Sequence, residues 1–214
     1  MFTNTTGANA YYQEASFGKL GLTGYARSDG DIYGWYTIPY DSTTCSYSSW
    51  ATAAEAAAKA DGFVRTNYND IEYAFPKSAC TWWGLASIGG NPGQSWVNGS
   101  YATKVVGHEL GHNFGMHHAN TYRCTDSTGV TVSISSTCKS TEYADPFDIM
   151  NSGSNNHLNA YHKGQASPGN WFEPANSFTI NRATMPDGTY TIAPVEQASG
   201  GIQSLRIPRD VSST

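Results

Sequence analysis

Four of the six histidines lie within one eleven-residue segment, HELGHNFGMHH, at positions 108–118. His108 and His112 are four residues apart, so on an α-helix they project from one face and can aim imidazole nitrogens at a single ion. Gly115 can adopt the left-handed backbone that ends a helix, and this turn would bring His118 to the same ion. Three neutral imidazoles with a fourth position open are typical of a catalytic zinc site.

Glu109 directly follows His108, so its carboxylate is expected to project toward the open fourth position. Zinc lowers the pKa of bound water from about 16 to about 7, so that hydroxide exists at neutral pH. Glu109 can take the proton of this zinc-bound water as general base and pass it to a departing amine. The pattern therefore predicts hydrolysis of a peptide bond.

The same histidines could be ordinary surface or core residues. Histidine is common in helices that bind nothing, but five fixed positions coincide by chance in about one in 10⁵ chains of this length. His117 falls one position short of the ligand pattern and is not assigned a role. One of His157, Tyr161 and His162 could support a developing oxyanion, but nothing in the spacing fixes its distance from zinc, and a surface or packing role is simpler.

The histidine segment resembles the zinc-binding sequence of the metzincin metallopeptidases, and residues 148–151 (DIMN) resemble their Met-turn. Met150 lies 32 residues after His118. The resemblance implies that Met150 forms a hydrophobic base beneath the zinc without ligating it. On its own, a single methionine would be better explained by core packing.

Ala119 differs from the Asp, Glu, Ser or Pro that follows the third histidine in adamalysins, astacins, matrixins and serralysins. Residues 34–38 (GWYTI), 80–85 (CTWWGL) and 142–146 (EYADP) are instead similar to the gametolysin-like peptidases, and the resemblance covers about Tyr11 to Trp171. It implies an α+β, metzincin-like fold: a twisted mixed sheet with helices above the active-site cleft and a loop-rich lower subdomain. Family members degrade extracellular proteins, from cell-wall glycoproteins to matrix components, so protein substrates and secretion are expected.

Local patterns predict the elements that must position these residues. An alanine-rich segment ending at Gly62 and the histidine segment predict helices, whereas alternating or aromatic-rich segments bounded by Gly or Pro predict strands. The predicted helices span 46–61 and 101–114, and the predicted strands span 17–26, 32–38, 71–75 and 82–88. Residues 115–172 have few periodic stretches and are predicted to be mostly loops. An extended substrate is expected to pair with an edge strand that includes part of 82–88.

Three further strand-like segments, 178–183, 189–192 and 205–207, lie around a turn at Pro186, Asp187 and Gly188. They predict a small β-rich C-terminal extension over 176–214 after a catalytic domain over 1–175.

Composition excludes several classes of protein. Charged residues make up 14% of the 214 residues and the formal net charge is −5, which fits neither a coiled coil nor a disordered chain. No basic run offers a surface for nucleic acid, and no apolar run reaches the roughly 20 residues needed to span a bilayer. We expect a monomer.

The four cysteines occur singly, without the CxxC pairs of a structural zinc or redox site, which favours disulfides. Three connectivities are possible. The pairing of Cys45 with Cys80 and of Cys124 with Cys138 is favoured, because the second pair closes a short loop rich in Gly, Ser and Thr.

Together these patterns predict a secreted zinc endopeptidase with His108, His112 and His118 as metal ligands and Glu109 as base. One alternative is a zinc-dependent hydrolase of another amide bond, such as one in a cell wall, which the same groups could serve. Another is a catalytically silent binding module that keeps zinc for stability, although the intact Glu109 argues against it.

Overall fold

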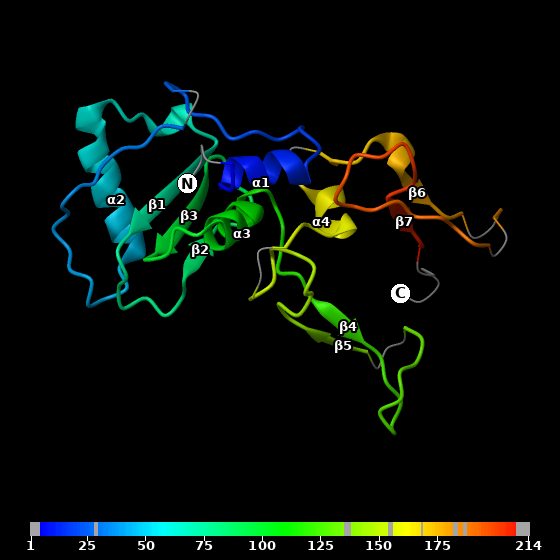
Figure 1. Ribbon diagram of the computed structural model, residues 1–214. Helices are drawn as coiled ribbons and strands as arrows, with labels where there is room; N and C mark the ends of the chain where they lie inside the picture. Colours follow the sequence, from blue (N-terminus) through cyan, green and yellow to red (C-terminus); the bar gives the residue numbers. More distant parts are fainter. Residues whose placement is uncertain are drawn as a thin grey trace.

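The computed structural model describes residues 5–27, 30–134, 138–153, 156–167, 169–181, 184–185 and 188–208. Within them, helices and small sheets form an α+β fold, as predicted (Figure 1). The α-helices are α1 (Ala8–Ala15), α2 (Tyr47–Ala58), α3 (Thr103–Asn113) and α4 (Ala160–Gln165), and the 3₁₀ helices are η1 (Lys59–Asp61), η2 (Arg65–Asn67) and η3 (Pro174–Asn176). The strands are β1 (Asp70–Phe75), β2 (Gly84–Ala86), β3 (Gly93–Asn98), β4 (Thr121–Arg123), β5 (Lys139–Thr141), β6 (Ser177–Thr179) and β7 (Ser204–Arg206).

The sheet that supports α3 has three strands in the order β1–β3–β2, with β3 parallel to β1 and antiparallel to β2. Strand β2 therefore has a neighbour on one side only within the described sheet, and it confirms the predicted edge strand over a shorter range than 82–88. Side chains alternate between the two faces of a sheet. One face packs on α2 and the other on α3, so the histidine helix lies directly against β2 and β3 (Figure 1).

The larger hydrophobic core lies on the α3 side of the sheet. Helix α1 contributes Tyr12, which is fully buried, and its ring lies 4.9 Å from that of Phe114 and 6.1 Å from that of Trp171 between ring centroids. The Tyr12 hydroxyl also donates to the carbonyl of Gly107 in α3. The N-terminal helix, which the sequence patterns did not predict, thus packs on the back of the histidine helix.

The predicted helix over 46–61 is confirmed as α2 followed by η1. It stops at Gly62, whose φ of +88° is a left-handed conformation that glycine adopts without steric cost. The predicted cysteine pairing is also confirmed, and the disulfides enclose sequence separations of 35 and 14 residues: Cys45–Cys80 and Cys124–Cys138.

The two early strands predicted over 17–26 and 32–38 are wrong, because the described residues of this region have no strand partner. Within 17–26, backbone amides bond instead to side chains and to nearby carbonyls. The amide of Leu20 donates to Ser16 Oγ at 2.8 Å, and that of Leu22 donates to a side chain of α1 at 2.7 Å. In 17–26 the alternation reflects Leu20 and Leu22, which reach the core from an irregular segment, whereas Ile32 and Trp35 of 32–38 are exposed.

The C-terminal region contains the predicted β structure in a different arrangement. Strand β6 pairs with β7 in parallel, whereas the predicted strand over 189–192 does not form. The predicted turn falls on Pro186 and Asp187, which lie outside the described residues, as do Arg182 and Ala183 of the predicted strand over 178–183. The division into domains over 1–175 and 176–214 stays a prediction. None of the described helices combines the length and the apolar character needed to cross a membrane.

Candidate active site

The three histidines predicted to bind metal converge in the structure. His108 and His112 lie on one face of α3, Gly115 turns the chain at a φ of +88°, and His118 follows. Ring centroids are 4.9 Å apart for His108 and His112, 4.9 Å for His112 and His118, and 5.5 Å for His108 and His118. One nitrogen from each ring lies within 4.8 Å of the other two, a spacing suited to a single ion.

The other nitrogen of each ring is already engaged by an acceptor. The Nδ1 atoms lie at hydrogen-bond distance from these acceptors: 3.0 Å from Ile149 O for His108, 2.7 Å from Met116 O for His112, and 2.6 Å from Glu142 Oε1 for His118. These acceptors favour the tautomer with a proton on Nδ1, which leaves each Nε2 lone pair available. The same support of ligand histidines by carbonyls and carboxylates is typical of zinc sites.

Electrostatics also favour metal binding at neutral pH. Burial lowers the pKa of His108 to about 3 and that of His112 to about 4, so both rings are neutral at pH 7. No proton then has to be displaced from these rings before they bind a cation. A set of three neutral imidazoles fits Zn²⁺ better than Ca²⁺ or Mg²⁺, which prefer oxygen ligands.

His118 lies outside the helix and is held by its neighbours in the loop. Besides the bond to Glu142, its ring stacks on Tyr143 with centroids 3.7 Å apart and an interplanar angle of 29°. Tyr143 has a φ of +61°, which is uncommon for a residue other than glycine. In the sequence, residues 142–146 stand out only through a family resemblance, so the roles of Glu142 and Tyr143 in orienting the third histidine were missed.

Replacement of Glu142 by alanine is expected to weaken zinc binding about 10–100-fold, because His118 loses the acceptor that fixes its tautomer and orientation. Competition with a chromophoric zinc chelator would measure the affinity. The exposed Glu14 of α1 provides a matched control, and Glu14→Ala should bind zinc like the wild type. Equal affinities in both variants would contradict the orienting role of Glu142.

Met150 lies beneath α3, at the place where the predicted Met-turn should be. It is fully buried, and a Cβ built on Gly111 would overlap the Met150 sulfur and lie 3.3 Å from its Cε. Glycine at this helix position, between the two ligand positions, therefore lets the methionine pack closely against α3. This position suits the predicted hydrophobic base.

The segment of the predicted Met-turn, residues 148–151, is fixed by polar contacts from two directions. From α3, the Lys104 ammonium donates to the carbonyls of Ile149 and Asn151. From the other side, the buried carboxylate of Asp148 accepts from the Met150 amide at 2.8 Å and lies 2.8 Å from Nδ1 of His162. Buried polar groups satisfied in this way specify one backbone conformation.

The three weaker oxyanion candidates have different environments. His162 is buried against Asp148, so packing and support of the Met-turn explain it. His157 lies beside Tyr11, with ring centroids 6.4 Å apart. Tyr161 is 65% exposed, and its ring lies beside that of His162 with centroids 5.7 Å apart. These surroundings favour packing roles for His157 and His162 and a surface role for Tyr161.

Glu109 is buried on the α3 face that meets the sheet, with its carboxylate against β2. Burial raises its pKa to about 8, and the nearby carboxylate of Glu72 adds to the increase. A bound cation would oppose this increase by favouring the charged form. Glu109 thus lies in a water-poor environment, where a carboxylate is a stronger base than in solution.

Glu72 on β1 is a half-buried residue whose carboxylate lies on this side of the sheet. Both of its carboxylate oxygens are buried and lack a hydrogen-bond partner among the described residues. Burial raises its pKa to about 7. Since Glu72 is not one of the three converging ligands, its main effect is expected on stability rather than on metal binding.

The raised pKa of Glu72 means that its neutral form stabilises the fold. This contribution is fully present below the unfolded pKa of about 4.5 and is lost as the pH rises through about 7. In metal-free protein, Glu72→Gln should therefore gain stability relative to the wild type between pH 5 and pH 8, by at most about 3 kcal/mol. Urea unfolding of both proteins at pH 5, 6.5 and 8 would measure this difference, and parallel pH profiles would contradict it.

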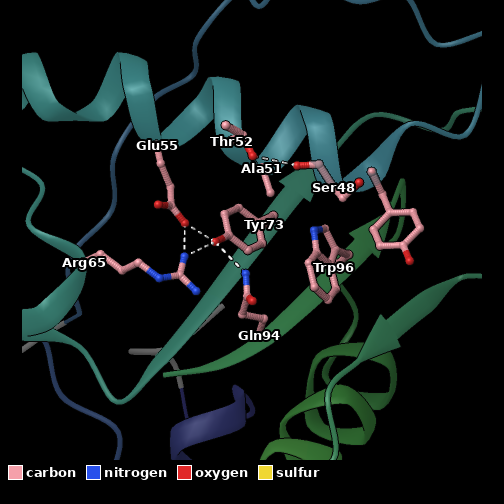
Figure 2. A pocket seen from close by; sticks show the side chains of 9 residues that line it. Ser48, Ala51, Thr52, Glu55, Arg65, Tyr73, Gln94 and Trp96 are labelled. Carbon is pink, nitrogen blue, oxygen red and sulfur yellow. Dashed lines mark hydrogen bonds and ion pairs between the residues drawn. The ribbon is translucent and has the colours of Figure 1, made fainter. Parts of the chain in front are cut away.

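A separate hollow of about 570 Å³ lies on the α2 side of the sheet, away from the histidines (Figure 2). The Tyr73 hydroxyl forms hydrogen bonds with Glu55, with Arg65 at 3.0 Å and with Gln94 at 3.1 Å. The charged groups of the hollow thus bind each other and the Tyr73 hydroxyl. The residues that line it are Tyr47, Ser48, Ala51, Thr52, Glu55, Arg65, Tyr73, Gln94 and Trp96. The histidine cluster on the other face of the sheet offers three nitrogen ligands for a metal ion.

Comparison with known proteins gives one match. The model of the family described as Gametolysin peptidase M11 matches residues 2–211. No curated protein and no solved structure matches the chain. The family match confirms the resemblance predicted from the motifs and extends it at both ends, beyond Tyr11 and Trp171.

Proposed function

Since the chain belongs to the gametolysin peptidase M11 family, we propose that it is a secreted zinc endopeptidase with Glu109 as its catalytic base. Family membership and the histidine cluster identify the protein as a metallopeptidase. The observation that carries the zinc assignment is the convergence of one free nitrogen each from His108, His112 and His118. These three residues would hold the ion.

Zinc, when bound, supplies a Lewis acid that makes water acidic and polarises a substrate carbonyl. Proton transfer is carried out by Glu109. Glu109 accepts the proton of the attacking water and then donates it to the nitrogen of the departing amine. Its burial keeps bulk water away from this transfer, and its place on α3 between the two ligand positions fixes it relative to them.

Substrate is proposed to bind as an extended peptide along β2. This strand has one neighbour in the described sheet, so an antiparallel or parallel peptide can add to its other side through backbone hydrogen bonds. Backbone pairing binds many sequences with little discrimination, as a peptidase that degrades structural proteins requires.

The proposed setting is extracellular, with matrix or cell-wall proteins as substrates. Two disulfides support this setting, because such bonds persist in oxidising compartments. The proposed layout is a metzincin-like catalytic domain over 1–175, with Met150 as the base beneath the metal, and a small β-rich extension over 176–214.

The proposal is tested by hydrolysis of quenched casein and gelatin by the purified chain, before chelation, after chelation, and after zinc is restored. Loss of cleavage on chelation and recovery with zinc would support a zinc endopeptidase. A zinc-loaded wild type that cleaves no protein would contradict it. Cell-wall peptides assayed in parallel would then separate an amidase of another bond from a silent binding module.

A further inference from the structure

Gly84, the first residue of β2, lies directly against the carboxylate of Glu109. A Cβ built on Gly84 would lie 2.5 Å from Glu109 Cδ and 2.6 Å from its Cγ, and it would overlap Oε1. Real Cβ atoms essentially never approach other heavy atoms that closely. The space that a side chain would need at position 84 is thus the space that the proposed base occupies.

The strand cannot easily withdraw to make room for a side chain at Gly84. Strand β2 is held by its ladder with β3, in which Gly84 lies opposite Val97, and the amide of Asn98 donates to the carbonyl of Trp83 at 2.8 Å. Val97 and Asn98 are themselves buried. The terminal atoms of Glu109 are the more mobile part of the contact, so a methyl group at position 84 would displace the carboxylate.

The backbone of Gly84 also belongs to the strand on which substrate is proposed to pair. Glu109 must lie beside the attacking water, and therefore beside the scissile bond, for proton transfer to occur. Because the carboxylate touches Gly84, the scissile bond of a strand-paired peptide lies at the level of this residue. At position 84, the strand proposed to align the substrate therefore contacts the proposed catalytic base.

We propose that Gly84 is a positioning residue, whose missing side chain sets the place of the Glu109 carboxylate between β2 and the clustered histidines. The inference rests on the proposed peptidase function. It adds to that function the claim that turnover requires glycine at position 84 of the edge strand. A displacement of about 1 Å in a catalytic group can lower the rate about 100-fold without loss of binding.

The test compares Gly84→Ala with the wild type as zinc-loaded proteins. We expect kcat to fall about 100-fold, with zinc stoichiometry retained and KM changed less than about threefold, because the pairing groups of β2 remain. Gly200→Ala is the matched control, since Gly200 is exposed, lacks a positive φ and has open space at its Cβ position. It should retain wild-type kcat.

Glu109→Ala provides the complementary background, because it removes the Cγ and Cδ atoms that the added methyl group would contact. Adding Gly84→Ala to Glu109→Ala should lower the residual kcat by less than about fivefold, since contacting residues give non-additive effects. A crystal structure of zinc-loaded Gly84→Ala should show the Glu109 carboxylate moved away from β2. This readout does not depend on activity.

The outcomes separate this inference from the proposed function. An active wild type whose kcat survives Gly84→Ala, or falls equally in both backgrounds, would overturn the positioning role and leave the peptidase intact. An unmoved Glu109 in the variant crystal structure would also overturn it. A zinc-loaded wild type without hydrolytic activity would instead remove the proposed function, and this inference with it.

Discussion

Zinc-loaded Glu109→Gln is expected to lose about 10⁴-fold in kcat/KM on a quenched protein substrate, the upper end of the range for general acid–base catalysis. Glutamine keeps the size of the side chain and fills the same buried space beside β2, but it cannot accept a proton. The loss is large because the proposed mechanism uses Glu109 twice, first as base and then as acid.

Zinc should remain bound in Glu109→Gln, since its proposed ligands are the three histidines. Inductively coupled plasma analysis would give the stoichiometry beside the kinetics. Glu173→Gln serves as the control, because Glu173 is an exposed residue paired with Lys19. Retention of more than about 10% of the wild-type rate by Glu109→Gln would show that another group activates the water.

The histidine site could be predicted from sequence because it is mostly local. A helix and one glycine turn place His108, His112 and His118, so spacing along the chain carries the geometry. The support of these rings could not be predicted in the same way. Glu142 is 24 positions from His118 along the chain, and Ile149 is 41 positions from His108, and no pattern in the sequence predicts contacts over such separations.

The central strand was missed for a physical reason. Strand β3 has the sequence GQSWVN, with Gly93, Gln94, Ser95 and Asn98 among its six residues, and such residues are depleted in strands. Tertiary context overrides this propensity. The buried amide of Asn98 donates to the carbonyls of Cys80 and Trp82 at 2.9 Å, so polar side chains in β3 organise the segment that leads to β2.

The early strands were predicted wrongly because alternation was the only available signal. The residues of 17–26 that reach the core do so next to α1, a helix of 8 residues that is shorter than the window of about 11–18 residues in which helical periodicity is recognised. Without α1, the partners of these backbone amides could not be identified, and a sheet was the simplest way to satisfy them.

Adjacent histidines allow the metal assignment to be tested within one dipeptide. His118→Ala should lose bound zinc on dialysis and at least about 10³-fold in activity, because one of three protein ligands and the several kcal/mol supplied by the metal are removed. His117→Ala should retain both, since His117 is exposed and is not one of the three converging rings. The two variants remove the same side chain at neighbouring positions, so differences in expression or net charge cannot explain a contrast between them.

The same pair of variants also tests the turn at Gly115. If the left-handed turn delivers residue 118 to the ion, as its φ of +88° and the bond from His118 to Glu142 indicate, only the second histidine of the dipeptide can reach it. Zinc loss in His117→Ala with retention in His118→Ala would mean that the loop adopts another register in solution. Equal zinc retention in both variants would mean that α3 binds the ion with a different third ligand.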